Sequence, residues 1–228
     1  MMVLESPDQW TDKILSAESV ATFNALNIPI GLESLEEIVS DEDISESYYS
    51  KRYSKPEWPG GDSGVTVLLG YDLGFATHDK VDHDLKGKIP DAMLTACQSC
   101  VGIKGVAAHS KMLQVHNQID LPWSIAWDVF LHNDIPRWLA TNEKVLPNTD
   151  KLSPNRRGIL LSLSYNRGAS YTLQGDRYKE MRYIKADMAA ERFDDIGYQL
   201  RAMARLWPIG NGVHSRRYRE AAIWDKWK

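Results

Sequence analysis

The chain has 228 residues, of which 43% are hydrophobic and 25% charged, as in an ordinary globular domain. Its formal net charge of −4 argues against a general basic surface for nucleic acid or for anionic membranes. The sequence contains neither a run of about 18 apolar residues nor the basic and apolar regions of a signal peptide, so we expect no membrane span and no cleaved leader.

The first 40 residues favour two amphipathic helices. Apolar residues recur at helical spacing in both segments, and a breaker at residues 27–31, with Pro29 and Gly31, separates them. The residues that mark the first helix are Trp10, Ile14, Leu15, Phe23 and Leu26, and those that mark the second are Leu35, Ile38 and Val39.

Residues 41–90 combine an acidic segment with the best strand of the chain. Proline and glycine at residues 56–64 indicate a loop. Residues 65–70 are β-branched and apolar and are bounded by glycines, which predicts a strand, and residues 71–74 leave it in a turn. We expect one small antiparallel sheet around residues 63–75.

Two groups of metal-ligand residue types carry weak patterns. His78, Asp79, Asp82, His83 and Asp84 lie together, but the two histidines are five residues apart, which fits neither a helix face nor a strand face. We therefore expect an exposed loop there and no metal site.

The second group is the single CxxC motif of Cys97 and Cys100. It lacks the second pair of ligands that a closed zinc site needs, and it follows a segment that reads as a helix. Two semi-buried thiols are expected.

After Pro90 the chain reads as helical. The strongest helix covers residues 153–167, because Ser153 can cap it, Pro154 suits its first turn, and Gly168 is a natural stop. Apolar spacing predicts two further helices, over residues 194–207 and 215–227.

The segment from Glu42 to Asp72 contains residue types suited to glycoside hydrolysis. That reaction uses one protonated and one ionised carboxylic group, held in unlike environments. Glu42 stands where a helix is expected to end, Thr66 lies in the strand, and Asp72 follows six positions later, so the last two can point the same way. On residue types alone, the acidic run at 41–43 fits a solvated helix end equally well.

Three blocks of sequence resemble one known family. Residues 58–66 (WPGGDSGVT) and 70–74 (GYDLG) resemble the signature of muramidases related to the activity domain of the bacteriocin pesticin, which are themselves similar to phage-type lysozymes. Residues 160–168 (LLSLSYNRG) resemble the helix that those lysozymes place beside the cleft. Residues 212–221, with the Arg-Arg-x-x-Glu pattern, resemble their C-terminal helix.

The resemblance implies an α+β, mainly helical, two-lobed lysozyme-like fold with a small antiparallel sheet. The whole chain, 1–228, would form a single catalytic domain, with N-terminal helices over residues 1–40, the acid and sheet region over 41–90, and a helical lobe over 91–228.

The resemblance also implies roles for individual residues. Glu42, seven positions before Tyr49, matches the catalytic acid, and Glu46, one helical turn later, is the alternative acid. Asp72 matches the base, and Thr66 matches the threonine that positions the water.

Further positions are expected to support the substrate or the fold. The residues expected to contact substrate are Tyr49, Tyr71, Asn166 and Arg167, although a capped helix end at Gly168 explains the last two nearly as well. Arg216 and Arg217 are expected to serve lobe packing. Leu68 and Leu69 replace the family's Ile-Gly pair, so we expect a narrower groove or an altered local backbone.

The expected activity is cleavage of the β-1,4 bond between N-acetylmuramic acid and N-acetylglucosamine by an inverting glycoside hydrolase without metal or organic cofactor. Two alternatives stay open: a non-catalytic peptidoglycan-binding or structural module, and a peptidoglycan amidase or peptidase. Reducing sugar ends, freed amines or no products would distinguish them.

The expected partner is peptidoglycan, with no nucleic acid, and the chain is expected to be a monomer. An endolysin released through a holin and an effector delivered by a secretion system both fit, the latter with export machinery or an immunity protein as additional partner. In either case the protein would be made in the cytoplasm and act in the bacterial periplasm or cell wall.

Overall fold

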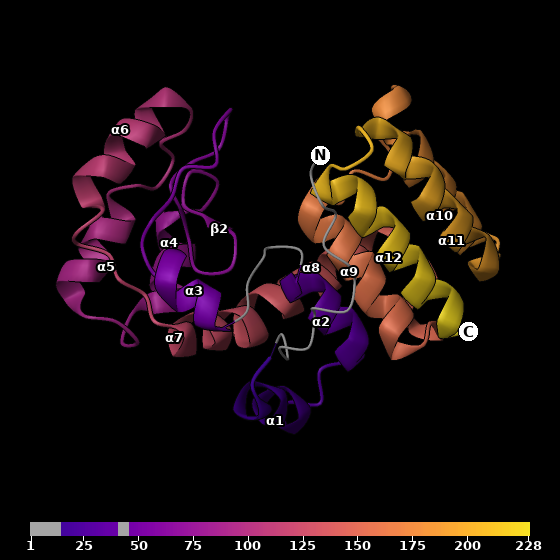
Figure 1. Ribbon diagram of the computed structural model, residues 1–228, viewed down its shortest axis with the longest axis horizontal. Helices are drawn as coiled ribbons and strands as arrows, with labels where there is room; N and C mark the ends of the chain where they lie inside the picture. Colours follow the sequence, from indigo (N-terminus) through magenta and orange to yellow (C-terminus); the bar gives the residue numbers. More distant parts are fainter. Residues whose placement is uncertain (1–14, 41–45) are drawn as a thin grey trace, which may run out of the picture. The chain divides into compact units, whose positions relative to one another are not determined.

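A computed structural model describes residues 15–40 and 46–228 of the chain. The chain forms two compact units, which we call unit 1 (Met1–Asp43 with Ile135–Lys228) and unit 2 (Ile44–Asp134) (Figure 1). In the described residues, helices dominate and one antiparallel sheet of two strands is present. The expectation of a mainly helical protein with a small antiparallel sheet is confirmed.

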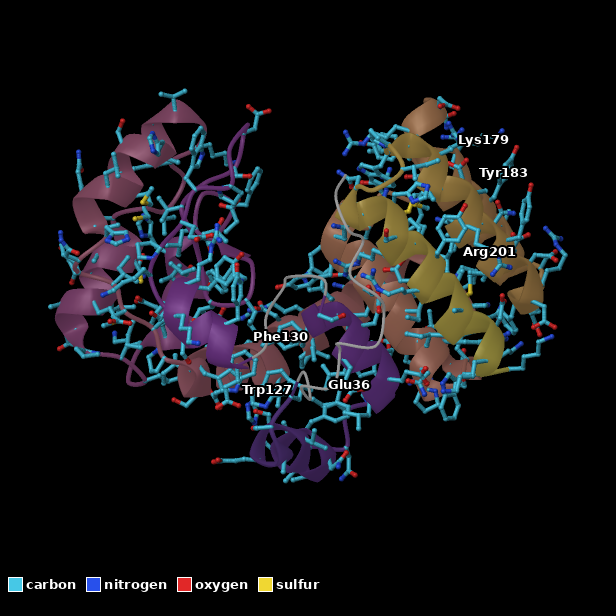
Figure 2. The ribbon with its side chains drawn as sticks, in the orientation of Figure 1. Glu36, Trp127, Phe130, Lys179, Tyr183 and Arg201 are labelled. Atoms are coloured by element: carbon cyan, nitrogen blue, oxygen red, sulfur yellow. The ribbon has the colours of Figure 1, made fainter. Side chains whose placement is uncertain are left out.

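Unit 2 contains the sheet and five helices of the described chain. Its elements are α3 (Glu46–Arg52), β1 (Thr66–Val67), β2 (Tyr71–Asp72), α4 (His78–Leu85), α5 (Asp91–Gln98), α6 (Val106–Val115) and α7 (Trp123–Val129), followed by a π-helical turn (Phe130–Asp134). Buried aromatic rings form part of its core: Trp123 stacks on Trp127 at 5.3 Å between ring centroids, and Phe130 lies 5.9 Å from Trp127 (Figure 2).

Unit 1 joins the start of the chain to its C-terminal part. Its helices are α1 (Ala17–Ala25), α2 (Leu32–Ser40), α8 (Ile135–Val145), α9 (Pro154–Arg167), α10 (Lys179–Ala189), α11 (Ile196–Met203) and α12 (Gly212–Lys226). Short 3-10 turns occur at Thr149–Lys151, Asp176–Tyr178, Phe193–Asp195 and Ala204–Leu206. The helix α2 packs against both α9 and α12.

The contact between α2 and α9 depends on a glycine and an asparagine. A Cβ at Gly158 would lie 1.9 Å from the Ser34 hydroxyl oxygen, so only glycine permits this approach of the two helices. The Asn155 side-chain oxygen accepts a hydrogen bond of 3.0 Å from the Ser34 backbone N–H, which satisfies a donor in the first turn of α2.

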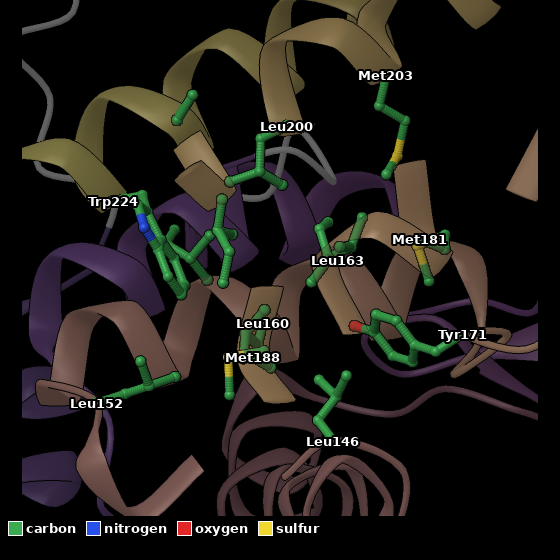
Figure 3. Close-up of a cluster of buried hydrophobic side chains, with 14 of the residues drawn as sticks. Leu146, Leu152, Leu160, Leu163, Tyr171, Met181, Met188, Leu200, Met203 and Trp224 are labelled. Atoms are coloured by element: carbon green, nitrogen blue, oxygen red, sulfur yellow. The ribbon is translucent and has the colours of Figure 1, made fainter. Parts of the chain in front are cut away.

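The core of unit 1 lies among α9, α10, α11 and α12 (Figure 3). Leucine and methionine side chains from these helices form one buried cluster with Trp224, whose indole N–H donates to the Phe193 carbonyl at 2.7 Å. Burial of such large apolar side chains provides most of the driving force for folding.

The predicted helix over residues 153–167 is confirmed as α9. Pro154 occupies its first turn, and Gly168 follows it with a φ of +70°, a conformation that favours glycine. The Ser153 hydroxyl donates to the Trp227 carbonyl at 2.7 Å, and α9 lacks a side-chain cap from this residue. The helices predicted over residues 194–207 and 215–227 are present as α11 and α12 with their flanking turns.

The prediction of one continuous strand over residues 65–70 is wrong. The strand β1 ends at Val67, and the chain turns through Leu68, with a φ of +53°, and Gly70, with a φ of +75°, before β2 begins. Leu68 and Leu69 are buried in this turn, so apolar residues that suit a strand instead form the end of a hairpin.

The prediction of an exposed loop at His78 to Asp84 is also wrong, because these residues form α4. The Thr77 hydroxyl caps the helix by accepting a hydrogen bond from the Lys80 backbone N–H. Val81 and Leu85, four positions apart, are buried on one face of it.

Three residues named in the sequence analysis have no described structure, and the boundary between the two units differs from the expected one. Trp10, Ile14 and Glu42 lie outside the described residues. The expected division at residue 90 differs from the observed one, since α5, α6 and α7 belong to the same unit as the sheet. Among the described residues, none of the helices is both long and apolar enough to cross a membrane.

Candidate functional site

The hairpin of unit 2 separates an apolar face from a polar face. Thr66 lies directly opposite Asp72 in the antiparallel register, and both side chains are partly exposed. The alternate positions are buried, as expected for a sheet that covers a core on one side: Val65, Val67, Tyr71 and Leu73. Thr66 and Asp72 were expected on one side of a single extended segment, whereas the structure places them opposite each other on two antiparallel strands.

The backbone bonding brings the Thr66 and Asp72 side chains close together. The Thr66 N–H and carbonyl both bond to Glu57, at 2.8 and 2.9 Å, on the side away from β2. Thr66 and Asp72 therefore form a non-hydrogen-bonded pair, whose Cβ atoms lie roughly 4.5–5.5 Å apart in antiparallel sheets. One water molecule could contact both side chains at such a separation.

Backbone N–H groups fix the Asp72 carboxylate. Gly64 N–H donates to both oxygens, at 3.0 Å to Oδ2 and 3.1 Å to Oδ1, and Gly74 N–H donates to Oδ1 at 2.8 Å. A carboxylate offers about four lone-pair positions, so Oδ2 retains an acceptor position for a further donor. This arrangement suits a group that must hold and orient a water molecule.

The two glycines are required by this close approach of backbone to carboxylate. A Cβ at Gly64 would lie 2.3 Å from Asp72 Oδ1 and 2.4 Å from the Gly74 backbone. A Cβ at Gly74 would lie 2.6 Å from the Ile103 carbonyl oxygen. The glycine-rich segment of the sequence thus serves the orientation of Asp72.

A third polar residue, Glu57, lies beside Thr66 and Asp72 on the same face of the sheet. The sequence did not predict its position there. Glu57 forms an isolated antiparallel bridge with Thr66, so Glu57, Thr66 and Asp72 succeed one another across the same face. The bridge pairs Glu57, a residue of the 56–64 loop, with Thr66 of β1. Pro56 and Pro59 flank Glu57 in the sequence, so no strand pattern is visible there. The only signal in the sequence was a carboxylate beside the conspicuous WPGG segment.

Of the two candidate acids, the structure describes Glu46 but not Glu42. Glu42 lies outside the described residues, so its role stays a prediction. Glu46 opens α3 and belongs to unit 2, as Asp72 does.

The tyrosines expected to contact substrate are instead buried. Tyr49 is 0% exposed, donates its hydroxyl to the Leu121 carbonyl at 2.9 Å and packs its ring on Trp123. Burial also raises the pKa of the Tyr49 phenol. With no exposed surface to offer a sugar, Tyr49 is in this structure a packing residue that anchors α3.

Tyr71 is buried through a second network, centred on a carboxylate. It donates to Asp84 Oδ2 at 2.9 Å and lies beneath the Lys80 ammonium, 3.5 Å from the ring centroid. Asp84 is fully buried and also accepts from Lys80 at 3.2 Å and from Asn133 Nδ2 at 2.9 Å. This network fixes the residue that precedes Asp72, which gives Tyr71 a supporting role and no direct substrate contact.

The residues at the end of α9 belong to unit 1. Asn166 is exposed, whereas Arg167 donates to the Arg177 carbonyl at 2.7 Å and lies over the Trp207 ring. Burial lowers the pKa of the Arg167 guanidinium, and the charges of Arg177 and Arg217 lower it further. These contacts favour a structural role for Arg167 at the helix end.

Arg216 and Arg217 are buried, in agreement with the packing role expected of them. Arg217 donates to Glu220 Oε1 at 2.9 Å, and Arg216 approaches the same oxygen at 3.3 Å. Ser162 of α9 donates its hydroxyl to that oxygen at 2.6 Å, so one carboxylate links α12 to α9.

The histidine-rich segment lies in α4, and the CxxC motif spans the end of α5. No group of three metal-ligand side chains exists among the residues that the structure describes. Cys97 and Cys100 are both free and fully buried, rather than semi-buried, and burial raises the pKa of the Cys97 thiol to about 12. Reactive cysteines are exposed and have a low pKa, so these thiols are structural.

Comparison with known proteins supplies no relative: no family model matches the chain, and no curated protein matches it.

Proposed function

We propose that this chain is a muramidase that cleaves the β-1,4 bond between N-acetylmuramic acid and N-acetylglucosamine in peptidoglycan, on a two-lobed lysozyme-like fold. The observation that carries this proposal is the pair formed by Asp72 and Thr66. The Asp72 carboxylate is held by two backbone N–H groups, and Thr66 stands opposite it on a partly exposed face. The resemblance to pesticin-like muramidases assigns the roles of base and water-positioning residue to these two positions.

In the proposed mechanism, Glu42 donates a proton to the glycosidic oxygen as the bond to the anomeric carbon breaks. Asp72 accepts a hydrogen bond from a water molecule at Oδ2, and the Thr66 hydroxyl orients that water. As the water attacks the anomeric carbon, its proton passes to Asp72. Water attack from the face opposite the leaving group inverts the anomeric carbon, for which carboxyl groups about 6.5–9.5 Å apart are typical.

The lack of side-chain donors on Asp72 favours this role. The residue is bonded to Gly64 and Gly74 through their backbone and has no lysine or arginine partner among its hydrogen bonds and ion pairs in the described residues. A carboxylate neutralised by a direct ion pair would be a weaker proton acceptor. Asp72 is thus oriented without a fixed positive charge.

The structure of α9 and α12 is consistent with the other two motif blocks. The Arg-Arg-x-x-Glu pattern of α12 folds into a buried ion cluster against α9, the helix that carries the second block. We propose that the protein acts in the bacterial periplasm or cell wall, reached through a holin or a secretion system.

The test is the chemistry of the products that the protein releases from purified Gram-negative peptidoglycan. We expect wild type to release fragments that end in reducing N-acetylmuramic acid. The variant Asp72→Asn should lose activity by about 10²–10⁴-fold, the scale of a general base. The variant Asp62→Asn, in an exposed loop position before the same hairpin, is the matched control and should keep wild-type activity.

The alternative functions give other products. Freed amines without new reducing ends would identify an amidase or peptidase, and binding without any product would identify a peptidoglycan-binding module. Full activity of Asp72→Asn would remove Asp72 from the reaction.

A further inference from the structure

We infer that Glu57 is a substrate-binding residue beside Thr66 and Asp72, where its carboxylate accepts hydrogen bonds from hydroxyl or amide donors of a bound sugar unit. This inference rests on the proposed function, because it names a further contact of the same site to the glycan strand. It is carried by the position of Glu57 in the sheet, by its exposure and by its charge.

The position of Glu57 is fixed by two backbone hydrogen bonds. Glu57 N–H donates to the Thr66 carbonyl at 2.9 Å, and Thr66 N–H donates to the Glu57 carbonyl at 2.8 Å. Residues that exchange both bonds lie directly opposite, with side chains on the same face of the sheet. The next residue, Trp58, donates its indole N–H to the Ser63 carbonyl at 3.1 Å, and its ring centroid lies 5.0 Å from that of His109.

The Glu57 side chain is accessible and weakly held. It is 39% exposed, and it forms an ion pair of 3.7 Å with Arg52, whose side chain is 60% exposed. Exposed pairs of this kind contribute little to stability. The Glu57 carboxylate therefore has acceptor positions for a ligand. Its weak ion pair with Arg52 contributes too little to stability to account for a carboxylate beside Thr66.

The two carboxylates that flank Thr66 differ in a way that suits different tasks. Asp72 is fixed by Gly64 and Gly74 N–H groups, so its geometry is prepared for one reacting water. Glu57 has a longer side chain, and within the described part of the chain its carboxylate is held by the exposed Arg52 and by none of the backbone N–H groups, so it can adapt to hydroxyl groups of a sugar. Because such contacts exist before and during the reaction, they chiefly affect substrate affinity and leave the chemical step nearly unchanged.

The experiment compares steady-state kinetics of wild type, Glu57→Gln and Glu57→Ala on soluble N-acetylglucosamine–N-acetylmuramic acid oligosaccharides. We expect KM to rise roughly tenfold for Glu57→Ala and less for Glu57→Gln, whose amide oxygen still accepts, in line with loss of one charge-assisted hydrogen bond. The kcat, the pH profile and the melting temperature should stay close to wild type. The matched control is Glu191→Gln, which removes an exposed, ion-paired glutamate of unit 1. This variant should have the KM, kcat, pH profile and melting temperature of wild type.

Three results would overturn the inference. An unchanged KM in Glu57→Ala would show that the side chain does not contact substrate. A large fall in kcat with a displaced limb of the pH profile would assign Glu57 to proton transfer. A fall in melting temperature that accounts for the lost activity would assign it to the fold.

Calorimetric binding of the same oligosaccharides separates this inference from the proposed function. If wild type binds but cleaves nothing, the muramidase proposal fails, and weaker binding by Glu57→Ala still supports the contact. If wild type neither binds nor cleaves, both proposals fail.

Discussion

At the scale of single residues, the site depends on backbone donors that only glycine can bring near a carboxylate. Gly64 and Gly74 are close enough to each other that neither position has space for a Cβ. The orientation of Asp72 is therefore determined by the path of the main chain. Substitution of a neighbouring glycine should disturb it as much as substitution of Asp72 itself.

The variant Gly64→Ala tests this dependence. Its added Cβ would lie 2.3 Å from Asp72 Oδ1 and 2.4 Å from the Gly74 backbone, so the strands must separate or the carboxylate must move. We expect a loss of about 1–3 kcal/mol in the free energy of unfolding, typical of overpacking, and a loss of hydrolytic activity. Chemical denaturation and the reducing-end assay measure the two effects.

The matched control is Gly212→Ala, at the start of α12. A Cβ at Gly212 meets no heavy atom within 4 Å, so this variant should unfold like wild type and keep its activity. Equal stability and activity of both alanine variants would disprove the steric argument at Gly64.

At the scale of elements, a buried carboxylate joins α12 to α9. Glu220 is 0% exposed and faces two buried arginines, Arg216 and Arg217, while Ser162 donates to it from α9. Burial lowers the pKa of Arg217, against the opposing effect of Glu220. The attraction between these charges offsets their loss of hydration only while all partners are present.

The variant Glu220→Gln should therefore be strongly destabilised. It removes the carboxylate charge that both buried guanidinium groups face, and loss of one partner of a buried pair costs about 3–5 kcal/mol. Glu191→Gln, which removes the exposed partner of Lys151, should cost about 0–1 kcal/mol. Urea denaturation of the two variants measures the difference, and a similar small cost for both would show that the cluster contributes little.

Elements with strong local signals were predictable from the sequence. The proline at the first turn of α9 and the glycine after it act within a few residues of the helix ends, and both boundaries were correct. The hairpin was only partly predictable, since the left-handed conformation of Leu68 depends on burial of the turn. The helix α4 was missed because its histidines and aspartates mask Val81 and Leu85, which fix its buried face.

The site was predictable only where residues lie close in sequence. Thr66 and Asp72 were expected together, and the hairpin pairs them. Tyr49 and Tyr71 were expected to contact substrate, but spacing along the chain gives no information on burial, and both lie in the core of unit 2. Glu57 was missed because a bridge of one residue pair leaves no periodic pattern.

At the scale of the whole molecule, unit 1 is assembled from distant parts of the chain. The helix α2 packs on α9 and α12, and Glu37 of α2 accepts from Arg219 of α12 at 3.0 Å. Composition and periodicity describe each helix by itself, so they could not predict this pairing. Asp72, the proposed base, belongs to unit 2, and Glu42, the proposed acid, lies outside the described residues.

The most direct test of the account is reducing-end release from purified Gram-negative peptidoglycan by wild type and Glu42→Gln, with Glu46→Gln as the matched neighbour. We expect wild type and Glu46→Gln to release reducing N-acetylmuramic acid ends, and Glu42→Gln to be slower by more than about 10²-fold, as for loss of a general acid. Loss of activity in Glu46→Gln alone would move the acid to that residue. Release of no reducing ends by the wild-type protein would contradict the account.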